Sequence, residues 1–246
     1  MLWLLAHRLF EFLAPYTCVA CDSRTDALIC DQCMDALIPW PKALCPGCGV
    51  PDPRPPAKPW RPCSHCEALQ SSGLDDLHIS WTYAGAASTI LHRAKFQRRP
   101  DIAVRLAALI AGNPPPEARI RHTDILISIP PSPQRLQNVG FDANAEMTAT
   151  LAWALQMPAA NHVLKRVSDA RQMYRTEDER RALIRNSFEL GARHQRVAGK
   201  NVLLIDDVRT TGSTLATTCR LLRIAGAKQV SAWVYAGRCR YTSVPE

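Results

Sequence analysis

A segment near the carboxyl end of the chain, residues 201–215, constrains the fold most, because an apolar run leads directly into two acids and a loop of small polar residues. The run Val202–Ile205 is short and bounded by turn residues, which is typical of a parallel strand covered on both faces. The pattern after the loop predicts a helix over 212–225, closed by Gly226. Strand, loop and helix in this order predict an α/β fold with its chemistry at the carboxyl end of the strand.

The side chains at this strand end suit a phosphorylated sugar. A helix N-terminus offers unpaired N–H groups and the positive end of the helix dipole to a phosphate. Asp206 and Asp207 are placed to accept hydrogen bonds from ribose hydroxyls or to hold Mg²⁺ through water. The candidate phosphate-binding residues after them are Thr210, Thr211, Gly212, Ser213 and Thr214. The alternative is an ordinary strand–turn–helix in which Ser213 caps the helix and Asp207 is a solvated residue at the strand end.

This segment resembles the phosphoribosyl-pyrophosphate (PRPP) loop of type I phosphoribosyltransferases. The resemblance implies that Asp206 and Asp207 face the ribose hydroxyls and that Thr210–Thr214 surround the 5′-phosphate, with PRPP and Mg²⁺ as ligands. The chain contains no G-x-x-x-x-G-K-[ST] sequence, so this is not the loop of a nucleotide-hydrolysing P-loop enzyme.

Eight of the ten cysteines form four successive C-x-x-C pairs within residues 18–66. Two such pairs supply four thiolates to one tetrahedral Zn²⁺, so the four pairs predict two structural zinc ions. Pairing in sequence order is the simpler prediction, with His65 as an alternative ligand. The predicted ligand sets are Cys18, Cys21, Cys30 and Cys33 for one ion, and Cys45, Cys48, Cys63 and Cys66 for the other.

A disulfide framework is the competing use of these cysteines, and it would require export from the cell. The apolar run at residues 1–13 is interrupted by His7, Arg8 and Glu11, and no small-residue cleavage site follows. No apolar stretch approaches the roughly 18 residues of a membrane span. We therefore expect a cytoplasmic protein with metal-bound cysteines. We also expect an N-terminal helix that packs on the protein or, alternatively, lies on a membrane surface through Leu2, Leu5, Leu9, Phe12 and Leu13.

Length and composition fit two modules, because 246 residues of which 47% are hydrophobic suffice for a small metal-binding unit and one α/β domain. We predict an N-terminal helix and double zinc ribbon over 1–74 and a type I phosphoribosyltransferase-like domain over 75–246. In the second part, strand and helix patterns alternate, which predicts a mostly parallel sheet with helices on both faces. The expected strands are 79–84, 124–129, 162–166, 201–206 and 229–236. One expected helix ends near residue 90, and the others cover 102–111, 143–156, 177–185 and 212–225.

The order of the segments resembles the ComF family over nearly the whole chain. The segments that carry the resemblance are the double zinc ribbon, Tyr83…Lys95-Phe96, Ile129–Arg135…Gly140-Phe141, Arg171-Gln172…Arg181…Arg185-Asn186 and the PRPP loop. By analogy with type I phosphoribosyltransferases, Ser132, Arg135 and Gly140 belong to a pyrophosphate loop opposite Thr210–Thr214. The family resemblance also implies handling of incoming single-stranded DNA during natural transformation, in partnership with a helicase-like protein.

Around the family pattern R-x-R-G-F-N-Q this chain differs, so the catalytic residues stay unassigned. The departing positions are Gln137, Val139, Asp142 and Ala143.

The charge balance favours a polyanionic partner, since 30 basic side chains against 22 acidic ones give a net charge of +8. Two groups of basic residues are candidates for contact with nucleic acid, and Trp60 near the ribbon is a candidate for base stacking. The groups are Arg93, Lys95, Arg98, Arg99 and Arg105, and Lys165, Arg166, Arg171, Arg175, Arg180, Arg181 and Arg185. The alternative is a solvated basic face with local ion pairs to Glu177, Asp178 and Glu179.

Three functions remain open at this point. The first is a DNA-binding accessory protein with a PRPP-type pocket, which the ribbon and the charge favour. The second is a phosphoribosyltransferase acting on an unidentified base, and the third is a metal-dependent interaction module with an inactive pocket.

Overall fold

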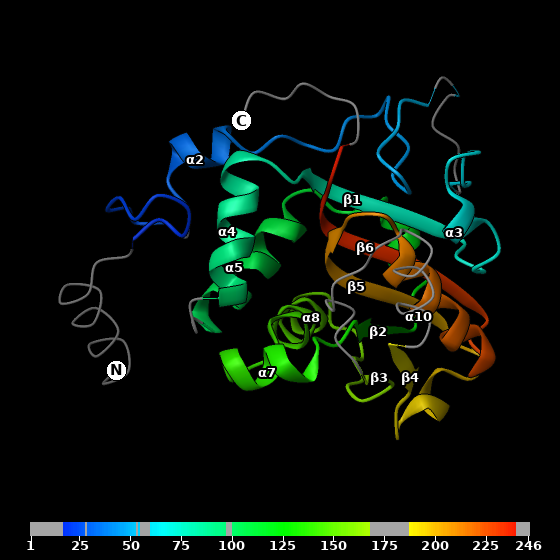
Figure 1. Cartoon of the computed structure of the whole chain (residues 1–246). Coiled ribbons are helices and arrows are strands. Elements are labelled where there is room, and N and C mark those ends of the chain that lie inside the picture. The colour runs from blue at the N-terminus through cyan, green and yellow to red at the C-terminus, as the bar shows by residue number, and fades with distance from the viewer. Residues whose placement is uncertain are drawn as a thin grey trace.

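The computed structural model describes residues 17–27, 29–52, 54, 60–96, 100–167 and 187–239 (Figure 1). The expected N-terminal helix and the expected helix over 177–185 lie outside the described residues.

A four-stranded parallel sheet forms the centre of the molecule, in the order β1-β6-β5-β2. The strands are β1 (Asp76–Thr82), β2 (Ile125–Ser128), β5 (Asn201–Arg209) and β6 (Gln229–Gly237). A separate antiparallel pair consists of β3 (Leu164–Arg166) and β4 (Phe188–Leu190). The prediction of a mostly parallel sheet is therefore confirmed.

Helices cover both faces of this sheet, as predicted (Figure 1). On one face lie α4 (Gly85–Phe96), α5 (Pro100–Ala111) and α8 (Ala143–Ala154), and on the other lie α3 (Glu67–Gln70) and α10 (Ser213–Ile224). Alternate residues of β5 serve the two sides, because successive side chains of a strand point to opposite faces. Leu203 and Ile205 pack with α4, α5 and α8, whereas Val202 and Leu204 pack with α10.

Six short elements among the described residues were not expected from the sequence, because runs of three to seven residues show too little periodicity to distinguish a helix or strand from a turn. Two of them, α3 and β4, are given above, and the others are α2 (Asp31–Asp35), α6 (Glu117–Arg121), α7 (Pro133–Val139) and the 3₁₀ helix η1 (His194–Val197).

The cysteine-rich part of the chain packs directly on the sheet. The backbone N–H of Trp40 donates to the carbonyl of Ser80 at 3.1 Å, and that of Thr82 donates to the carbonyl of Ile38 at 2.7 Å. Residues 38–40 thereby cover the outer edge of β1, an edge that would otherwise expose unpaired backbone groups. The domain boundary near residue 75 stays a prediction, while residues on both sides of it share one hydrophobic core.

Within the described residues, no helix is long and apolar enough to cross a membrane.

Candidate functional site

Asp206 and Asp207 lie at the point of the sheet where β2 ends and its neighbour β5 continues. β5 continues to Arg209, three residues beyond the expected strand end at Asp206, and pairs with β6 over this whole length. On the other side, β2 pairs only as far as Ser128 opposite Ile205. The prolines at 130, 131 and 133 follow, and proline has no N–H with which to continue a ladder. The sheet therefore opens at Asp206, at the carboxyl end of the shorter strand.

Asp206 is held rigidly in this opening and is only 5% exposed. Its Oδ1 accepts hydrogen bonds from the backbone N–H of Asp207 at 2.9 Å and from Nδ2 of Asn144 at 3.3 Å. The same Asn144 amide donates to the carbonyl of Ile129 at 2.9 Å, so it joins the end of β2 to the acid. Burial, and then the negative charge of Asp207, raise the pKa of Asp206 to about 7.

Two cationic side chains from different helices lie beside Asp207. Nζ of Lys95, from the last turn of α4, lies 2.7 Å from Oδ2 of Asp207, and a terminal guanidinium nitrogen of Arg135, from α7, lies 3.6 Å from the same oxygen. The side chains of Lys95 and Asp207 are only 14% and 8% exposed. Burial lowers the pKa of Lys95, and the charge of Asp207 opposes that shift. The structure thus places Lys95, a nucleic-acid candidate, beside Arg135, a pyrophosphate-loop candidate.

The predicted pyrophosphate loop is largely the helix α7. The Oγ atom of Ser132 caps it by accepting from the backbone N–H of Arg135 at 3.3 Å, and Pro133 is its first residue. Gly140 ends it in the left-handed region at φ +89°. These are ordinary cap signals, and they could have revealed the helix in the sequence. A small hollow beside the acids is lined by Lys95, Pro131, Arg135, Phe141 and Asn144, among others.

Two residues at the start of α8 lie near the site and were not among the candidates for it. Asp142 caps α8 by accepting from the backbone N–H of Ala145 at 3.0 Å, and burial raises its pKa to about 6. Asn144 follows in the first turn of α8 and reaches Asp206. In the sequence, a capping residue at 142 followed by a polar residue at 144 indicates the start of a helix. This signal does not indicate which strand the start of the helix will face.

The predicted phosphate loop lies at the start of α10. Gly212 is the N-cap residue and adopts φ +81°, a conformation that side chains disfavour. The hydroxyls of Thr211 and Ser213 lie 3.0 Å apart. The first-turn N–H groups of a helix have no partner within the helix, so hydroxyl and amide donors are concentrated here.

The second cysteine set packs against this loop. A β-carbon on Gly212 would lie 2.9 Å from Cδ1 of Leu69 in α3 and 3.2 Å from the carbonyl oxygen of Gly47, which lies between Cys45 and Cys48. Glycine is therefore required at 212 by both the backbone angle and the close approach.

A buried arginine makes a second connection between the ribbon and the loop. Arg209 is 1% exposed, and its guanidinium carbon lies 4.8 Å from the ring centre of Trp40. One guanidinium nitrogen donates to the carbonyls of Thr210 and Arg238, each at 2.9 Å. Burial lowers the pKa of Arg209 to about 10, and the nearby Cys48 is the largest opposing influence. A tetrathiolate metal site carries negative charge, which a guanidinium at this position would offset.

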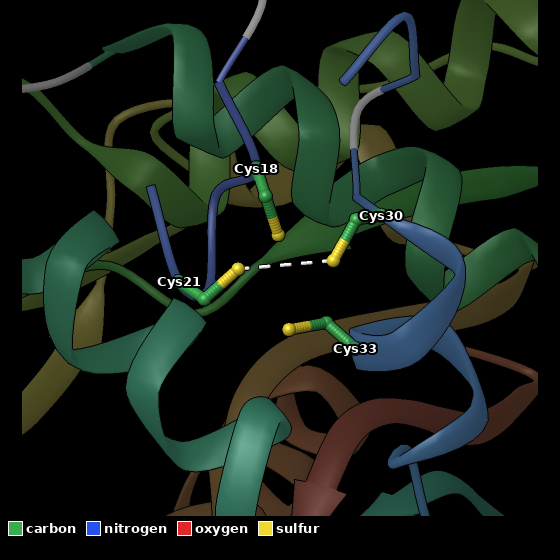
Figure 2. Close-up of side chains that lie close together, drawn as sticks. All are labelled: Cys18, Cys21, Cys30 and Cys33. Atoms are coloured by element: carbon green, nitrogen blue, oxygen red, sulfur yellow. Dashed lines mark hydrogen bonds between the residues drawn. The ribbon is translucent and has the colours of Figure 1, made fainter. Parts of the chain in front are cut away.

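The cysteines gather in two sets that follow sequence order, and in each set all four sulfurs lie within 4.8 Å of one another. Figure 2 shows the first set pointing toward a common centre. Separations of 3.4 Å for Cys48–Cys63 and 3.7 Å for Cys21–Cys30 compare with roughly 3.8 Å between corners of a tetrahedron with 2.3 Å Zn–S bonds. All ten cysteines are free thiols, and His65 is exposed outside the second set. Both sets can hold a metal ion and are compatible with zinc.

The first set is fastened to the helices by two arginines. The guanidinium of Arg93 in α4 donates to both carboxylate oxygens of Asp22 at 2.6 and 2.7 Å. Arg105 in α5 donates to the carbonyl of Thr17 at 3.2 Å. Both arginines belong to the first basic group proposed for nucleic acid, and here they hold the chain around Cys18 and Cys21.

The sequence of the chain is similar to those of proteins named for DNA utilization or competence. The DNA utilization protein YhgH of Salmonella typhimurium is 30% identical over 209 residues, which cover 83% of this chain and 88% of that protein. The chain belongs to the ComF family. Competence protein F of Haemophilus influenzae is 26% identical over 83% of this chain and 94% of its own length, and Competence protein ComFC of Bacillus subtilis is 25% identical over 83% and 88%.

The carboxyl-terminal part of this ComF-family chain also matches a domain model. The model described as the phosphoribosyl transferase domain matches residues 157–246, which include both acids and the loop before α10. Among solved structures, the allosteric regulatory enzyme of purine biosynthesis is similar over 58% of this chain and 30% of its own, with 18% identity and a TM-score of 0.40.

The remaining nucleic-acid candidates are placed as follows. Lys165 is exposed and lies 2.7 Å from Glu189 on the neighbouring strand, and Arg166 stacks over the ring of Phe188 at 5.2 Å. Trp60 is half-buried and packs against the core beside the second cysteine set. Outside the described residues lie Arg98, Arg99, Arg171, Arg175, Arg180, Arg181 and Arg185.

Proposed function

We propose that this protein handles incoming single-stranded DNA during DNA uptake and that its site at the end of β5 binds PRPP or a similar ribose phosphate. The observation that carries the pocket is the acid pair at the opening of the sheet, followed at once by a glycine-turned loop at the start of α10. The DNA role is supported by the relatives, whose names refer to competence and DNA utilization and whose alignments extend over most of both chains.

In this proposal different residues bind the ribose, the 5′-phosphate and the diphosphate of PRPP. Asp206 and Asp207 accept hydrogen bonds from the ribose hydroxyls, and the hydroxyls and N–H groups of Thr210–Thr214 donate to the 5′-phosphate. Lys95 and Arg135 lie beside Asp207, where a diphosphate on the sugar would be attracted by their charge. The cysteine sets hold zinc, and the second of them supports the loop from behind through Leu69 and Gly47.

The test of the pocket is calorimetric titration of PRPP into the wild type and into a variant with Asp206→Asn and Asp207→Asn. We expect binding by the wild type and its loss in the variant, with unchanged circular dichroism. Asp26→Asn with Asp35→Asn, two exposed acids, removes the same charge elsewhere and should bind as the wild type does. Equal binding by both double variants would contradict the assignment.

The proposal also includes a helicase-like protein partner and a cytoplasmic location, both inferred from the sequence. Affinity purification from a naturally competent host, with DNA digested by nuclease, tests the partner. Recovery of an ATP-dependent helicase-type protein with the wild type, and not with a chain lacking the first cysteine set, is the expected result.

Transfer of phosphoribose to an unidentified base is the second candidate. The specific observation in its favour is the pair of cations at Asp207, because a diphosphate leaving group needs positive charge beside the sugar. Pyrophosphate release from PRPP should then depend on adding a nucleobase. Release at the same rate with and without any base in a mixed pool would count against the transferase.

A further inference from the structure

The acid pair is already neutralised by the chain's own groups. Among the described residues, Oδ2 of Asp207 is shared by the ammonium of Lys95 at 2.7 Å and the guanidinium of Arg135 at 3.6 Å. Oδ1 of Asp206 accepts from two N–H groups, one of them from Asn144. A magnesium ion needs carboxylate oxygens or their bound waters without a fixed cation among them. At Oδ2 of Asp207 the ammonium of Lys95 occupies the place that a Mg²⁺ ion would take.

We propose that Lys95 takes the place of a divalent cation in this site, so that a ribose diphosphate binds without Mg²⁺. The inference rests on the proposed PRPP-type pocket and says how its ligand's charge is balanced. An ammonium group has three donors, so Lys95 can bridge Asp207 and diphosphate oxygens, as a metal ion bridges acids and phosphates elsewhere.

The position of Lys95 is set by packing. Its neighbours in α4, Leu91 and Ala94, are buried at 1% and 0% exposure against α5 and the sheet. Packing therefore positions the last turn of α4, and Lys95 lines the hollow together with Pro131, Arg135 and Asn144. The Lys95 side chain is only 14% exposed, so it is already largely withdrawn from water, as a bridging cation must be before it contacts a ligand.

The charge of the whole cluster supports the same conclusion. Lys95 and Arg135 lie beside Asp207, and the charge of Arg166 acts on Asp206. Three cations therefore oppose the carboxylates of Asp142, Asp206 and Asp207, so the cluster carries no excess negative charge that would concentrate divalent ions. Because the pKa of Asp206 is raised to about 7, protonation near neutral pH only makes the cluster more positive. An anionic ligand is favoured over a free cation under these conditions.

The experiment is a PRPP titration in buffer passed over a chelating resin, compared with the same titration in excess Mg²⁺. No soluble chelator is added, so that the cysteine sets keep their metal. We expect wild-type dissociation constants that agree within about tenfold between the two buffers, whereas Lys95→Met should lose about a hundredfold in affinity without Mg²⁺ and regain it when Mg²⁺ is added. Lys200→Met, which removes an exposed lysine, should match the wild type in both buffers.

Electron paramagnetic resonance with Mn²⁺ alone gives a readout independent of PRPP. Mn²⁺ prefers carboxylate oxygens and does not displace zinc from thiolates. The wild type should leave Mn²⁺ free, Lys95→Met should bind it, and Lys95→Met with Asp207→Asn should release it again.

The outcomes separate the inference from the function on which it rests. PRPP binding by the wild type only in Mg²⁺, or equal behaviour of Lys95→Met and wild type without Mg²⁺, overturns the role of Lys95 and leaves the pocket standing. Absence of PRPP binding by the wild type in both buffers overturns the pocket itself and the inference with it. Wild-type binding that requires Mg²⁺ overturns the role of Lys95 even if Lys95→Met fails to fold.

Discussion

Leu69 packs so closely against Gly212 that a β-carbon on the glycine would lie 2.9 Å from Cδ1 of the leucine. Leu69 belongs to the short helix that begins directly after Cys66, and Gly212 is the residue where the loop after β5 turns into α10. The metal-binding part of the chain and the phosphate loop therefore share one packed surface, although some 140 residues separate them in sequence.

Replacing Gly212 by alanine tests this surface. The β-carbon would meet Leu69 and would also impose a left-handed angle of φ +81°, so we expect a loss of about 2–4 kcal/mol of folding free energy. Gly199→Ala is the matched control, since Gly199 has φ +69° with nothing within 4 Å of the added carbon, and should cost only about 1 kcal/mol. Urea unfolding measures both. Equal losses of folding free energy in the two variants would mean that Leu69 moves aside without cost.

Metal analysis should find two zinc ions per chain. Structural zinc contributes about 10–16 kcal/mol of apparent binding free energy in small peptides, so its removal should unfold the cysteine-rich part. Because the second set backs the loop, PRPP affinity should fall along with the metal content. Elemental analysis and calorimetry on the same metal-stripped sample test this. Two findings would contradict it: four disulfides, or full PRPP affinity in metal-free protein.

Asp206 should make stability depend on pH. Its pKa is raised from 3.8 to about 7 in the folded state, mainly by burial, so the folded chain binds more protons than the unfolded chain between these values. Stability from this group is therefore lost as the pH rises through that range. In Asp206→Asn this loss disappears, and we expect the variant to gain roughly 1–3 kcal/mol on the wild type between about pH 5 and pH 8. Thermal unfolding at both pH values measures the gain, and Asp26→Asn should show none.

The basic residues outside the described part of the chain should carry most of the contact with DNA. Changing Arg180, Arg181 and Arg185 to alanine should weaken binding to single-stranded DNA of any sequence and flatten its salt dependence, by about 0.7 in log–log slope for each lost phosphate contact. Fluorescence anisotropy over a salt series gives the slope. In a competent host the triple variant should also lower transformation while leaving DNA capture at the cell surface unchanged.

A variant of equal charge controls for the overall positive field. Changing the exposed arginines at 121, 193 and 196 to alanine removes three charges from other parts of the surface. If both triple variants reduce the slope equally, binding depends on net charge and not on the Arg180–Arg185 cluster.

The sequence patterns were sufficient for the main sheet and its large helices. The apolar run before Asp206 predicted a buried parallel strand, and the segments around Ile102 and Leu151 predicted the helices that cover it. Strand ends were harder to predict, because β5 extends past Asp206 on account of pairing with β6. Local patterns do not contain that partner.

The composition of the site was only partly predictable for the same reason. Asp206 and Asp207 can be recognised in the sequence, because they are two adjacent acids directly after a predicted strand. Lys95 does not, because a lysine among arginines is indistinguishable from a surface charge until the packing of α4 is known. Asn144 was missed because its importance depends on where the start of α8 meets the end of β2.

The position of β6 has a consequence for how the protein is made. This strand comes last of those described, yet it lies between β1 and β5, with one ladder to each. A ribosome delivers the cysteine-rich segment and β1 first, and β1 has no neighbour in the central sheet until residues 229–237 emerge. Chains released before that point would contain both acids, the phosphate loop and both cysteine sets, but they would lack the strand that lies between β1 and the acids. Quality control in the cell should therefore treat loss of this one strand as loss of the whole protein.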